Sequence, residues 1–592
     1  MNPGRLGSVL TEVDRGSLKT VVWPKTAPPQ ATGAGRHPGG KHRGKHGGRR
    51  AVAARVATGC AALLVFLALI APQTVGQLTP AALVRIPVEG LLGVVLVLVV
   101  AARARRVVAA LGGVVLGLLT ILKIVDMGFG VFLSRPFDPV LDWSLAGDAG
   151  AFLTGSIGRA GATAVGVAAV GLVAGVLIVM TRSVLRLTDL VVRHRTAAIR
   201  AVAVLAPVWL VCAVFGAQIV TPVPIAARSL ASLAYAKARQ VPVSLRDEEV
   251  FASQVGVDPF QNTPGDKLLT GLRGKDVIFT FVESYGRDAV QDPEFAPKVG
   301  AVLDEGNRRL SAAGYASRSA FLTSPVAGGG SWLAHATFFS GQWIDTIQRH
   351  RTLVSTDRLT LPGAFRRANW RTVSVMPNTG GAWPEGKFYG YDQVYEFENL
   401  GYRGPKFGWA TMPDQYTLST FDRTEMARPG RGPLMGELVL VSSHMPWTPL
   451  PRMINWGAVG DGSVYRPMAE EGESEAVVWR DRAKVRTQYE RSIEYSLNSL
   501  ISYVETHGSD NLVLVFLGDH QPAPIVTGEG ASRDVPITIV ARDRAVLDRI
   551  SGWGWQDGLK PGPNAPVWRM DAFRDRFLTA FGSQPEAAAA SR

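Results

Sequence analysis

The segment LVLVFLGDHQP, residues 512–522, decides the fold class of the second half of this chain. It opens with six apolar residues in a row, which is typical of a strand that is buried on both faces of a sheet. Two polar side chains, Asp519 and His520, follow directly after this run. In α/β domains, functional residues collect just past the carboxyl ends of the strands. The segment therefore predicts a buried strand that carries polar side chains to one edge of a sheet.

Four further runs of the same kind occur in the second half of the chain. We expect them to form strands at Val277–Val282, Val373–Met376, Leu438–Val441 and Val535–Val540. Between the runs, apolar residues recur at helical spacing, for example from Ile493 to Val504. Because strands and helices alternate, we predict that residues 275–582 form an α/β domain with a mostly parallel sheet sandwiched by helices.

The first 220 residues contain five apolar stretches that approach the roughly 20 residues a membrane span needs. The expected spans are 56–75, 86–102, 107–133, 160–181 and 201–220. Segment 51–220 is therefore predicted to be a bundle of five transmembrane helices, followed by an extracytoplasmic linker at 221–274. Part of the linker, 226–239, is expected to form an amphipathic helix. In the third span, Lys123 and Asp126 are spaced to pair on one helix face.

The net charge of +14 is unevenly distributed. Residues 1–50 hold ten Lys or Arg residues against two acids, and we interpret them as a disordered basic cytoplasmic tail that contacts anionic lipid rather than nucleic acid. More arginines fall between the second and third spans and between the fourth and fifth, on the same side. The positive-inside rule makes that side the cytoplasm, so five spans place the second half outside it. Residues 583–592 are expected to be a second disordered tail.

Three of the expected strands end in residues that can bind a metal ion or a phosphate. The first leads to Glu283 and Ser284, another leads through two serines to His444, and the segment quoted above leads to Asp519 and His520. Three such endings in one domain indicate a convergent site. Carboxylates with imidazole suit Mn²⁺, Mg²⁺ or Zn²⁺, and the set does not choose between them.

A glycine run at 328–330 precedes Ser331 and an expected helix at Trp332–Phe339. A Gly-rich turn that enters a helix presents backbone N–H groups and a positive helix end to an anion. Ser331 is well placed there to act as a nucleophile, since metal coordination would lower the pKa of its hydroxyl.

Three neighbouring side chains leave alternatives open. Thr323 and Ser324 are rival hydroxyls for the nucleophile, although the sequence around Ser324 lacks the arginine of a sulfatase signature. His335 lies about one helical turn beyond Ser331 and faces either the site or the sheet.

These motifs, taken in chain order, resemble those of the sulfatase/alkaline-phosphatase superfamily. Together with five spans, they resemble the lipoteichoic acid synthase group, the membrane phosphoglycerol transferases, over about residues 50–580. Two further stretches also resemble that group. One is Trp383 with the following Tyr389-Gly390-Tyr391-Asp392, and the other is residues 408–414.

The resemblance implies a role for each candidate residue. It implies a divalent metal ion, with Mn²⁺ expected and Mg²⁺ or Zn²⁺ as alternatives. Ser331 would be the catalytic nucleophile, where the synthases carry threonine. His444 would contact the substrate and Trp383 would line the pocket. The implied metal ligands are Glu283, Ser331, Asp519 and His520.

One position departs from the pattern of the synthases. They carry an arginine two residues after this tryptophan, where the present chain has Glu385. An arginine would pair with a phosphate, whereas a glutamate would repel it. Lys387 is the nearby candidate to replace the charge in substrate binding.

Three functions are compatible with this pattern. The first is a cell-membrane enzyme that transfers a phosphoglycerol-like head group from a membrane lipid to an envelope glycan or polymer through a serine-linked intermediate. The second is a phosphate- or sulfate-ester hydrolase with the same site. Sulfate hydrolysis is disfavoured because the two cysteines, Cys60 and Cys212, lie in the membrane half, so the outer domain has no cysteine to supply a formylglycine. The third is a non-catalytic envelope scaffold.

Overall fold

The computed structural model describes residues 45–220, 223–379 and 383–583. By its internal contacts the chain divides into two units, residues 1–57 and residues 58–592. The helix α1 (Lys45–Ile70) runs across this boundary, and its first part is all that is described of residues 1–57. The two expected disordered tails lie outside the described residues, apart from 45–50, which form the first turns of α1, and Ser583.

Four helices in the described residues are long and apolar enough to cross a membrane. The expected second span, 86–102, instead contains α2 (Val88–Val99), whose 12 residues rise about 18 Å. This is well short of the roughly 30 Å hydrocarbon core. The expected bundle of five spanning helices is therefore not confirmed. The four candidates are Arg50–Ile70 in α1, Ala102–Leu133 (α3), Ile157–Arg193 in α4 (Ser144–Arg193) and Arg195–Val214 (α5).

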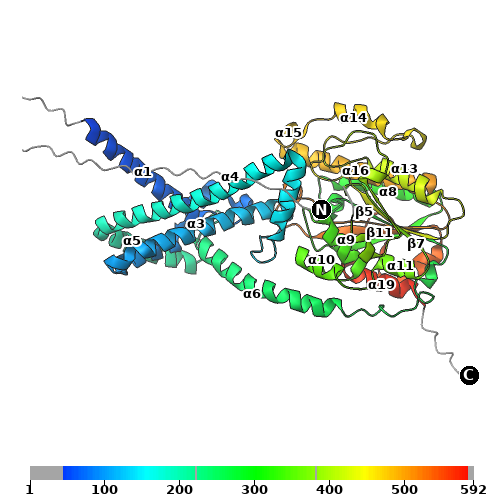
Figure 1. Cartoon of the computed structure of the whole chain (residues 1–592), viewed down its shortest axis with the longest axis horizontal. Coiled ribbons are helices and arrows are strands. Elements are labelled where there is room, and N and C mark those ends of the chain that lie inside the picture. Colours follow the sequence, from blue (N-terminus) through cyan, green and yellow to red (C-terminus); the bar gives the residue numbers. More distant parts are fainter. Residues whose placement is uncertain (1–44, 221–222, 380–382, 584–592) are drawn as a thin grey trace, which may run out of the picture. The chain divides into compact units, whose positions relative to one another are not determined.

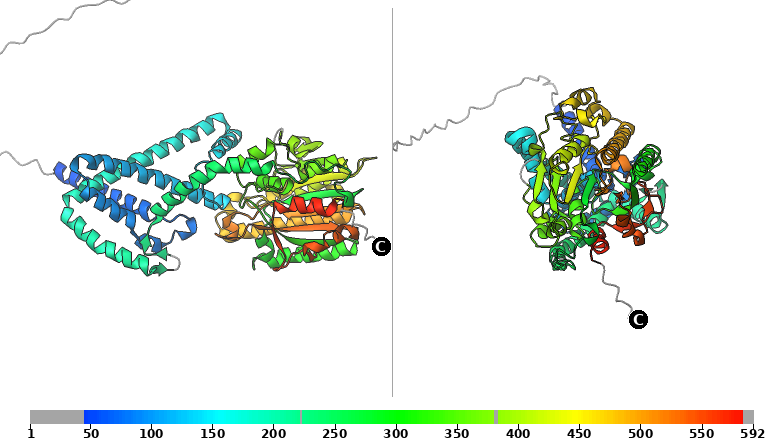
Figure 2. Two further views of the ribbon diagram at one scale, coloured as in Figure 1. Left: turned by 90° about the horizontal axis from the view of Figure 1, so that it is seen from below. Right: turned by 90° about the vertical axis from the view of Figure 1, so that its right-hand side faces the viewer.

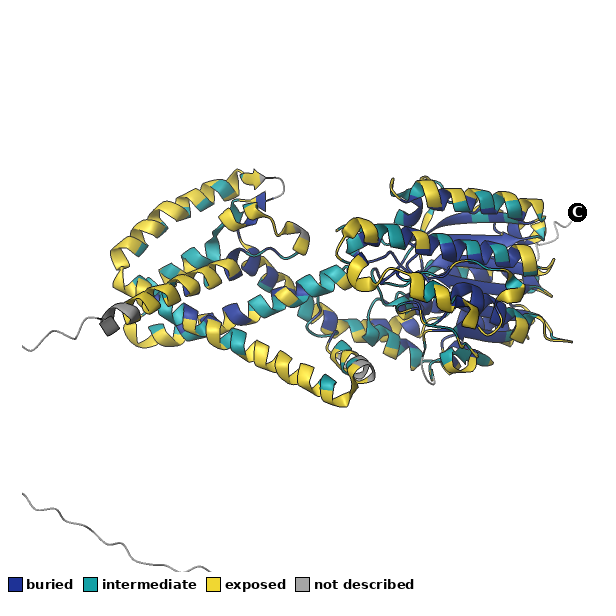
Figure 3. Cartoon of the chain, turned by 90° about the horizontal axis from the view of Figure 1, so that it is seen from above, coloured by how far each residue is buried: buried dark blue, intermediate teal, exposed yellow. Residues whose placement is uncertain are grey.

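The apolar side chains of these helices are largely exposed, in contrast to the buried strands of the second half (Figure 3). Val170 and Leu172 on α4, for example, are 71% and 70% exposed. Exposed apolar surface on this scale marks a membrane or interaction surface rather than the surface of a soluble domain.

The two charges in the third expected span do not pair with each other. Lys123 donates to the backbone carbonyls of Ala68 and Ala71, at 3.2 and 2.7 Å. Asp126 forms a buried ion pair with Lys237, at 2.9 Å. Lys237 belongs to α6 (Ser229–Val255), which occupies part of the expected amphipathic segment and continues far beyond it.

Two small strand pairs flank this part of the chain. β1 (Ile86–Pro87) pairs with β4 (Ala226–Ala227) in parallel, and β2 (Gln218–Val220) pairs with β3 (Val223–Pro224) antiparallel.

The second half is built on a nine-stranded sheet. All five expected runs form strands in it. Their bounds are β5 (Asp276–Val282), β7 (Arg371–Met376), β9 (Leu434–Leu440), β10 (Leu512–Gly518) and β11 (Asp534–Ala541). Four strands were not expected from the sequence, namely β6 (Ala316–Thr323), β8 (Gln393–Glu396), β12 (Gln556–Asp557) and β13 (Val567–Arg569).

The sheet is mixed. Its order is β12-β6-β11-β10-β5-β9-β7-β8, with β13 beside β6. The strands from β10 to β8 all pair in parallel. β11 runs antiparallel to both of its neighbours, and β12 runs antiparallel to β6. The expected mostly parallel sheet is therefore not confirmed, and the parallel pairing forms one continuous block that includes β5 and β10.

Helices cover both faces of the sheet (Figure 1), and Figure 2 gives two further views. The central strand β5 shows why, because its apolar side chains alternate between two cores. Val277 and Phe279 belong to one core, and Ile278 and Val282 to the other. The first core includes α9 (Ser331–Ser340), α10 (Ile347–Val354), α11 (Leu361–Arg367) and α19 (Ala572–Phe581), and the second includes α8 (Ala296–Ala312), α13 (Asp414–Phe421) and α16 (Arg482–His507).

Shorter helices lie in the connections between these elements. They are α7 (Arg287–Gln291), α12 (Gly386–Tyr389), α14 (Arg466–Glu471), α15 (Glu475–Val478), α17 (Pro524–Thr527) and α18 (Arg544–Asp548).

Candidate active site

The pairing of β5 with β10 brings the two main polar strand ends together. The strands run in parallel with Val282 opposite Gly518, so the residues that follow each strand are neighbours. Glu283 follows β5, and Asp519 follows β10. The backbone N–H of Ser284 donates to Asp519 Oδ1 at 2.8 Å and ties the two ends together.

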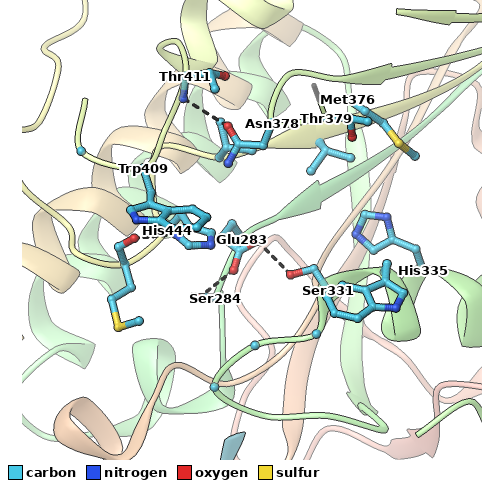
Figure 4. A pocket seen from close by; sticks show the side chains of 18 of the residues that line it. Glu283, Ser284, Ser331, His335, Met376, Asn378, Thr379, Trp409, Thr411 and His444 are labelled. Atoms are coloured by element: carbon cyan, nitrogen blue, oxygen red, sulfur yellow. Dashed lines mark hydrogen bonds between the residues drawn. The ribbon is translucent and has the colours of Figure 1, made fainter. Parts of the chain in front are cut away.

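The glycine run delivers the candidate nucleophile to the same place. Gly328, Gly329 and Gly330 have φ values of 77°, 156° and 86°, which L side chains rarely adopt. The tight turn that results makes Ser331 the first residue of α9. Its Oγ donates to Glu283 Oε2 at 3.0 Å and lies 3.2 Å from His520 Nε2. Figure 4 shows Ser331 and Glu283 joined by this hydrogen bond.

The donor atoms converge as a metal site requires. One ligand atom each from Glu283, Asp519 and His520 lie within 4.8 Å of one another. His520 Nε2 is 3.3 Å from Glu283 Oε1 and 3.7 Å from Asp519 Oδ2. Asp519 Oδ2 is buried and has no hydrogen-bond partner among the described residues. Buried polar atoms in proteins almost always have a partner, so this oxygen fits a role as a metal ligand.

The electrostatics of the site also favour a cation. Burial and the neighbouring Glu283 raise the pKa of Asp519 to about 6. Burial alone would lower the pKa of His520, but Asp519 and Glu283 raise it to about 9. Burial would also raise the pKa of Glu283, but His444 and His520 together hold it below its usual range. Two buried carboxylates that share one imidazole form the environment in which a divalent ion is bound with release of protons.

Neither rival hydroxyl is among the residues that line the cavity of the site. Ser324 is fully buried and donates to the backbone carbonyl of Asp519 at 2.6 Å. Thr323 donates to Asp534 at 2.7 Å. Ser324 therefore supports the end of β10 that carries Asp519, and Ser331 is the hydroxyl that contacts Glu283 and His520.

A cavity of 640 Å³ opens beside Ser331 and Glu283. Trp383 and His444, which were predicted to contact the substrate, both line it. The indole of Trp383 stacks on Tyr389 at 5.3 Å between ring centroids. The imidazole of His444 stacks on Trp409 at 5.6 Å, as Figure 4 shows.

Lys387 does not reach this cavity. It is exposed on α12, and the lysine that lines the cavity is Lys406. Glu385 is also not among the lining residues, so the carboxylate that departs from the synthase pattern lies outside the cavity wall.

Several lining residues were not identified from the sequence. His335, whose orientation the sequence left open, lines the cavity and also packs on the sheet, where its ring stacks on Phe281 of β5. Glu437, Lys406 and Trp409 also line it. Glu437 carried a signal that could have found it, because it is a glutamate inside the otherwise uncharged run Leu434–Leu440. Lys406 and Trp409 lie in a loop without periodicity, and the sequence offered no comparable signal for them.

Taken together, the fold and the site define a class of protein. Its members have an α/β domain in which a hydroxyl, two carboxylates and an imidazole converge at one edge of the sheet, and apolar helices precede this domain in the chain. No protein-family model matches the sequence, and no curated protein matches it. Similar solved structures do exist.

Three solved structures illustrate this likeness. The lipoteichoic acid synthase LtaP from Listeria monocytogenes is 15% identical, with a TM-score of 0.35, over 57% of this chain and 80% of that one. The integral membrane lipooligosaccharide phosphoethanolamine transferase A from Neisseria meningitidis is 11% identical, with a TM-score of 0.39, over 82% and 86%. The phosphoglycerol transferase GacH from Streptococcus pyogenes, in complex with sn-glycerol-1-phosphate, is 12% identical, with a TM-score of 0.32, over 57% and 90%.

Proposed function

We propose that this chain is a membrane-anchored, metal-dependent transferase. It moves a phosphorus-containing head group of the phosphoglycerol type from a membrane lipid to a hydroxyl of an envelope glycan or polymer. The observation that carries the proposal is the meeting of Ser331 Oγ with Glu283 and His520, at 3.0 and 3.2 Å, on the wall of a cavity.

The metal ion would be held by Glu283, Ser331, Asp519 and His520. The donor set suits Mn²⁺, with Mg²⁺ or Zn²⁺ as alternatives. When bound there, such an ion would lower the pKa of the serine hydroxyl and neutralise charge on the transferring group.

The cavity supports a head group larger than phosphate. A volume of 640 Å³ lies within the roughly 300–1,000 Å³ of pockets that bind small molecules. His444 and Lys406 supply donors for phosphate oxygens, and the rings of Trp383 and Trp409 supply apolar walls for the carbon skeleton.

The reaction has two halves. Ser331 Oγ attacks the phosphorus of the lipid phosphodiester, the bond from phosphorus to the lipid oxygen breaks, and diacylglycerol leaves. The head group then remains attached to Ser331. An acceptor hydroxyl attacks the same phosphorus and releases Ser331, which completes the transfer.

The apolar helices support a lipid donor. A domain that is anchored in the bilayer meets its lipid at a high effective concentration. We place the domain outside the cytoplasm, since the basic tail and the arginine-rich loops mark the inner side. This placement requires the short helix α2 and its flanking residues to count as one crossing, in addition to the four longer helices.

The test uses the full chain in nanodiscs that contain phosphatidylglycerol, loaded with Mn²⁺. The wild type is expected to release diacylglycerol and to carry a head group on Ser331, which intact-protein mass spectrometry detects. Ser331→Ala should abolish both signals. Ser355→Ala, which changes an exposed serine, should keep both. Wild-type turnover by the Ser331→Ala variant would refute the assignment.

The same assay separates the alternatives. A hydrolase would release the free head group at the same rate with and without an acceptor glycan. A transferase would attach the head group to the acceptor. A non-catalytic scaffold would bind no stoichiometric metal and form no adduct.

A further inference from the structure

A second buried polar cluster lies in the wall of the same cavity. Its centre is Glu437 on β9, which is 1% exposed and lines the cavity. Glu437 Oε2 accepts hydrogen bonds from the Tyr391 hydroxyl at 2.6 Å and from Ser374 Oγ at 2.9 Å. The other oxygen, Oε1, lies 3.0 Å from His335 Nδ1, which is ion-pair distance, but it has no hydrogen bond of good geometry among the described residues. A carboxylate in the middle of a sheet is costly to bury, so this cluster needs an explanation.

The geometry leaves one nitrogen of His335 available. The imidazole is 7% exposed and stacks on Phe281, with ring centroids 3.8 Å apart. Nδ1 faces Glu437, whereas Nε2 is buried and has no hydrogen-bond partner among the described residues. Both His335 and Ser331 line the cavity, and both lie on α9, one turn apart. Figure 4 shows the imidazole on the same side of the cavity as Ser331.

His335 is the member of the cluster that can take up a proton. Burial and the Glu437 carboxylate raise the pKa of Tyr391, so this phenol stays protonated and acts only as a donor. Ser374 is also a neutral donor. The imidazole is therefore the group of the cluster that can carry a positive charge opposite Glu437. A carboxylate behind an imidazole orients the ring and stabilises the imidazolium that forms when the far nitrogen takes a proton.

We propose that His335 is the proton carrier of the transfer reaction and that Glu437 is its positioning residue. This inference rests on the function proposed above and adds an acid and base to it. It also gives the buried carboxylate on β9 a reason to be there.

The proton balance closes over the two halves. In the first half, the Oγ–P bond forms, the bond from phosphorus to the lipid oxygen breaks, and the departing oxygen takes the proton from Nε2 of the imidazolium. In the second half, the acceptor hydroxyl gives its proton to Nε2 as its oxygen bonds to phosphorus and the Oγ–P bond breaks. His335 is therefore an imidazolium again at the end of the cycle. Ser331 attacks as an alkoxide in the first half and is released as an alkoxide in the second. Protonation of a departing group by a positioned side chain contributes roughly 10²–10⁴-fold in rate.

The experiment compares two donors with each full-length variant in nanodiscs. One donor is glycerol 4-nitrophenyl phosphate, whose nitrophenolate leaves without a proton. The other is phosphatidylglycerol, whose alkoxide needs one. His335→Gln is expected to keep the nitrophenol burst within about threefold of wild type and to slow diacylglycerol release by roughly 10²–10⁴-fold. With the nitrophenyl donor, His335→Gln should also accumulate the Ser331 adduct, because the acceptor hydroxyl lacks its base in the second half.

Glu437→Gln should show the same pattern with a smaller loss, because the imidazole remains but is less well oriented. His507→Gln is the matched control. His507 Nδ1 lies 3.2 Å from Asp422 Oδ2, which is a comparable imidazole–carboxylate pair, but neither residue lines the cavity. It should leave the rates with both donors unchanged.

The comparison of two donors within one variant is independent of how much of that variant folds. Equal losses with both donors, or no loss with either, would overturn the role of His335. A wild type that forms no serine adduct with either donor would overturn the transferase itself and the inference with it. An adduct that forms normally while His335→Gln shows no dependence on the donor would overturn the inference alone.

Discussion

Asp519 divides its two carboxylate oxygens between two tasks. Oδ1 accepts the backbone N–H groups of Ser284 and His520, at 2.8 and 2.7 Å, and these bonds fix the position of the side chain. Oδ2 has no such partner among the described residues and is left for a ligand. One oxygen therefore provides the geometry, and the other provides the proposed coordination.

We expect Asp519→Asn to lose the metal, because the amide brings no charge and offers N–H groups where the ion needs an oxygen. The loss in Mn²⁺ affinity should exceed the roughly 10–100-fold that follows from losing an outer partner of a metal ligand. Isothermal titration calorimetry on the full chain measures it. Asp534→Asn, a carboxylate paired with Arg287 away from the site, is the control and should bind as wild type does. An unchanged affinity in Asp519→Asn would contradict the proposed ligand set.

The sequence predicted residues that follow strands better than residues inside them or in loops. Glu283 and Asp519 stand out because a polar side chain follows an apolar run. Glu437 lies on β9 itself and Lys406 in a loop, where position depends on contacts across the sheet. Lys387 was assigned from its closeness in sequence to Trp383, but the helix α12 directs it to solvent.

At the scale of elements, the junction between β5 and β10 depends on a close backbone approach. A Cβ atom placed on Gly518 would lie 1.8 Å from the carbonyl oxygen of Tyr285. Only glycine fits there, and this allows the turn after β5 to reach Asp519. The geometry of the proposed metal ligands therefore depends on a residue that has no side chain.

Gly518→Ala is expected to force β10 away from this turn. We expect a cost of about 1–3 kcal/mol in the free energy of unfolding, as for overpacked cores, and weaker Mn²⁺ binding. Denaturant unfolding and calorimetry measure the two effects. Gly552→Ala is the matched control, since a Cβ there meets nothing within 4 Å. Equal behaviour of the two variants would contradict the close approach.

The strand β6 shows why the sequence analysis missed part of the sheet. β6 has the sequence ASRSAFLT, in which serine and arginine interrupt the apolar pattern, although it forms register pairs with β11 along its whole length. Its antiparallel partner β11 was expected to be a strand, but its direction was not predicted. Strand direction depends on which neighbours meet in three dimensions, and a single run of apolar residues does not encode it.

At the scale of the whole molecule, the side of the membrane depends on α2. Four long apolar helices alone would return the chain to the side where it started. The 12-residue α2 must supply the further crossing if the second half is to lie outside the cytoplasm. Its first-turn Glu89 accepts the N–H groups of Leu230 and Ala231 in α6, at 3.1 and 2.9 Å, so α2 is fixed to the segment that leads to the α/β domain.

Cysteine labelling tests this topology. In a chain whose Cys60 and Cys212 are replaced by serine, Ser509→Cys marks the second half and Ala101→Cys marks the arginine-rich turn, both at exposed positions. A membrane-impermeant maleimide applied to intact cells should label Ser509→Cys at once and Ala101→Cys only after permeabilisation. The opposite pattern would place the α/β domain in the cytoplasm and exclude the proposed outer-surface acceptor.

The strand pairing that builds the site also has a consequence for biosynthesis. Ser284 and Asp519, which hydrogen-bond across the β5–β10 junction, are 235 residues apart in the chain. At roughly 5–20 residues per second, a ribosome needs about 10 to 50 s to add the residues between them. During that interval the nascent chain carries Glu283 and, later, Ser331, but it lacks Asp519 and His520. If the proposed ligand set is correct, metal binding follows the synthesis of Asp519 and His520, and a chain cut short before Asp519 would lack two of the four proposed ligands.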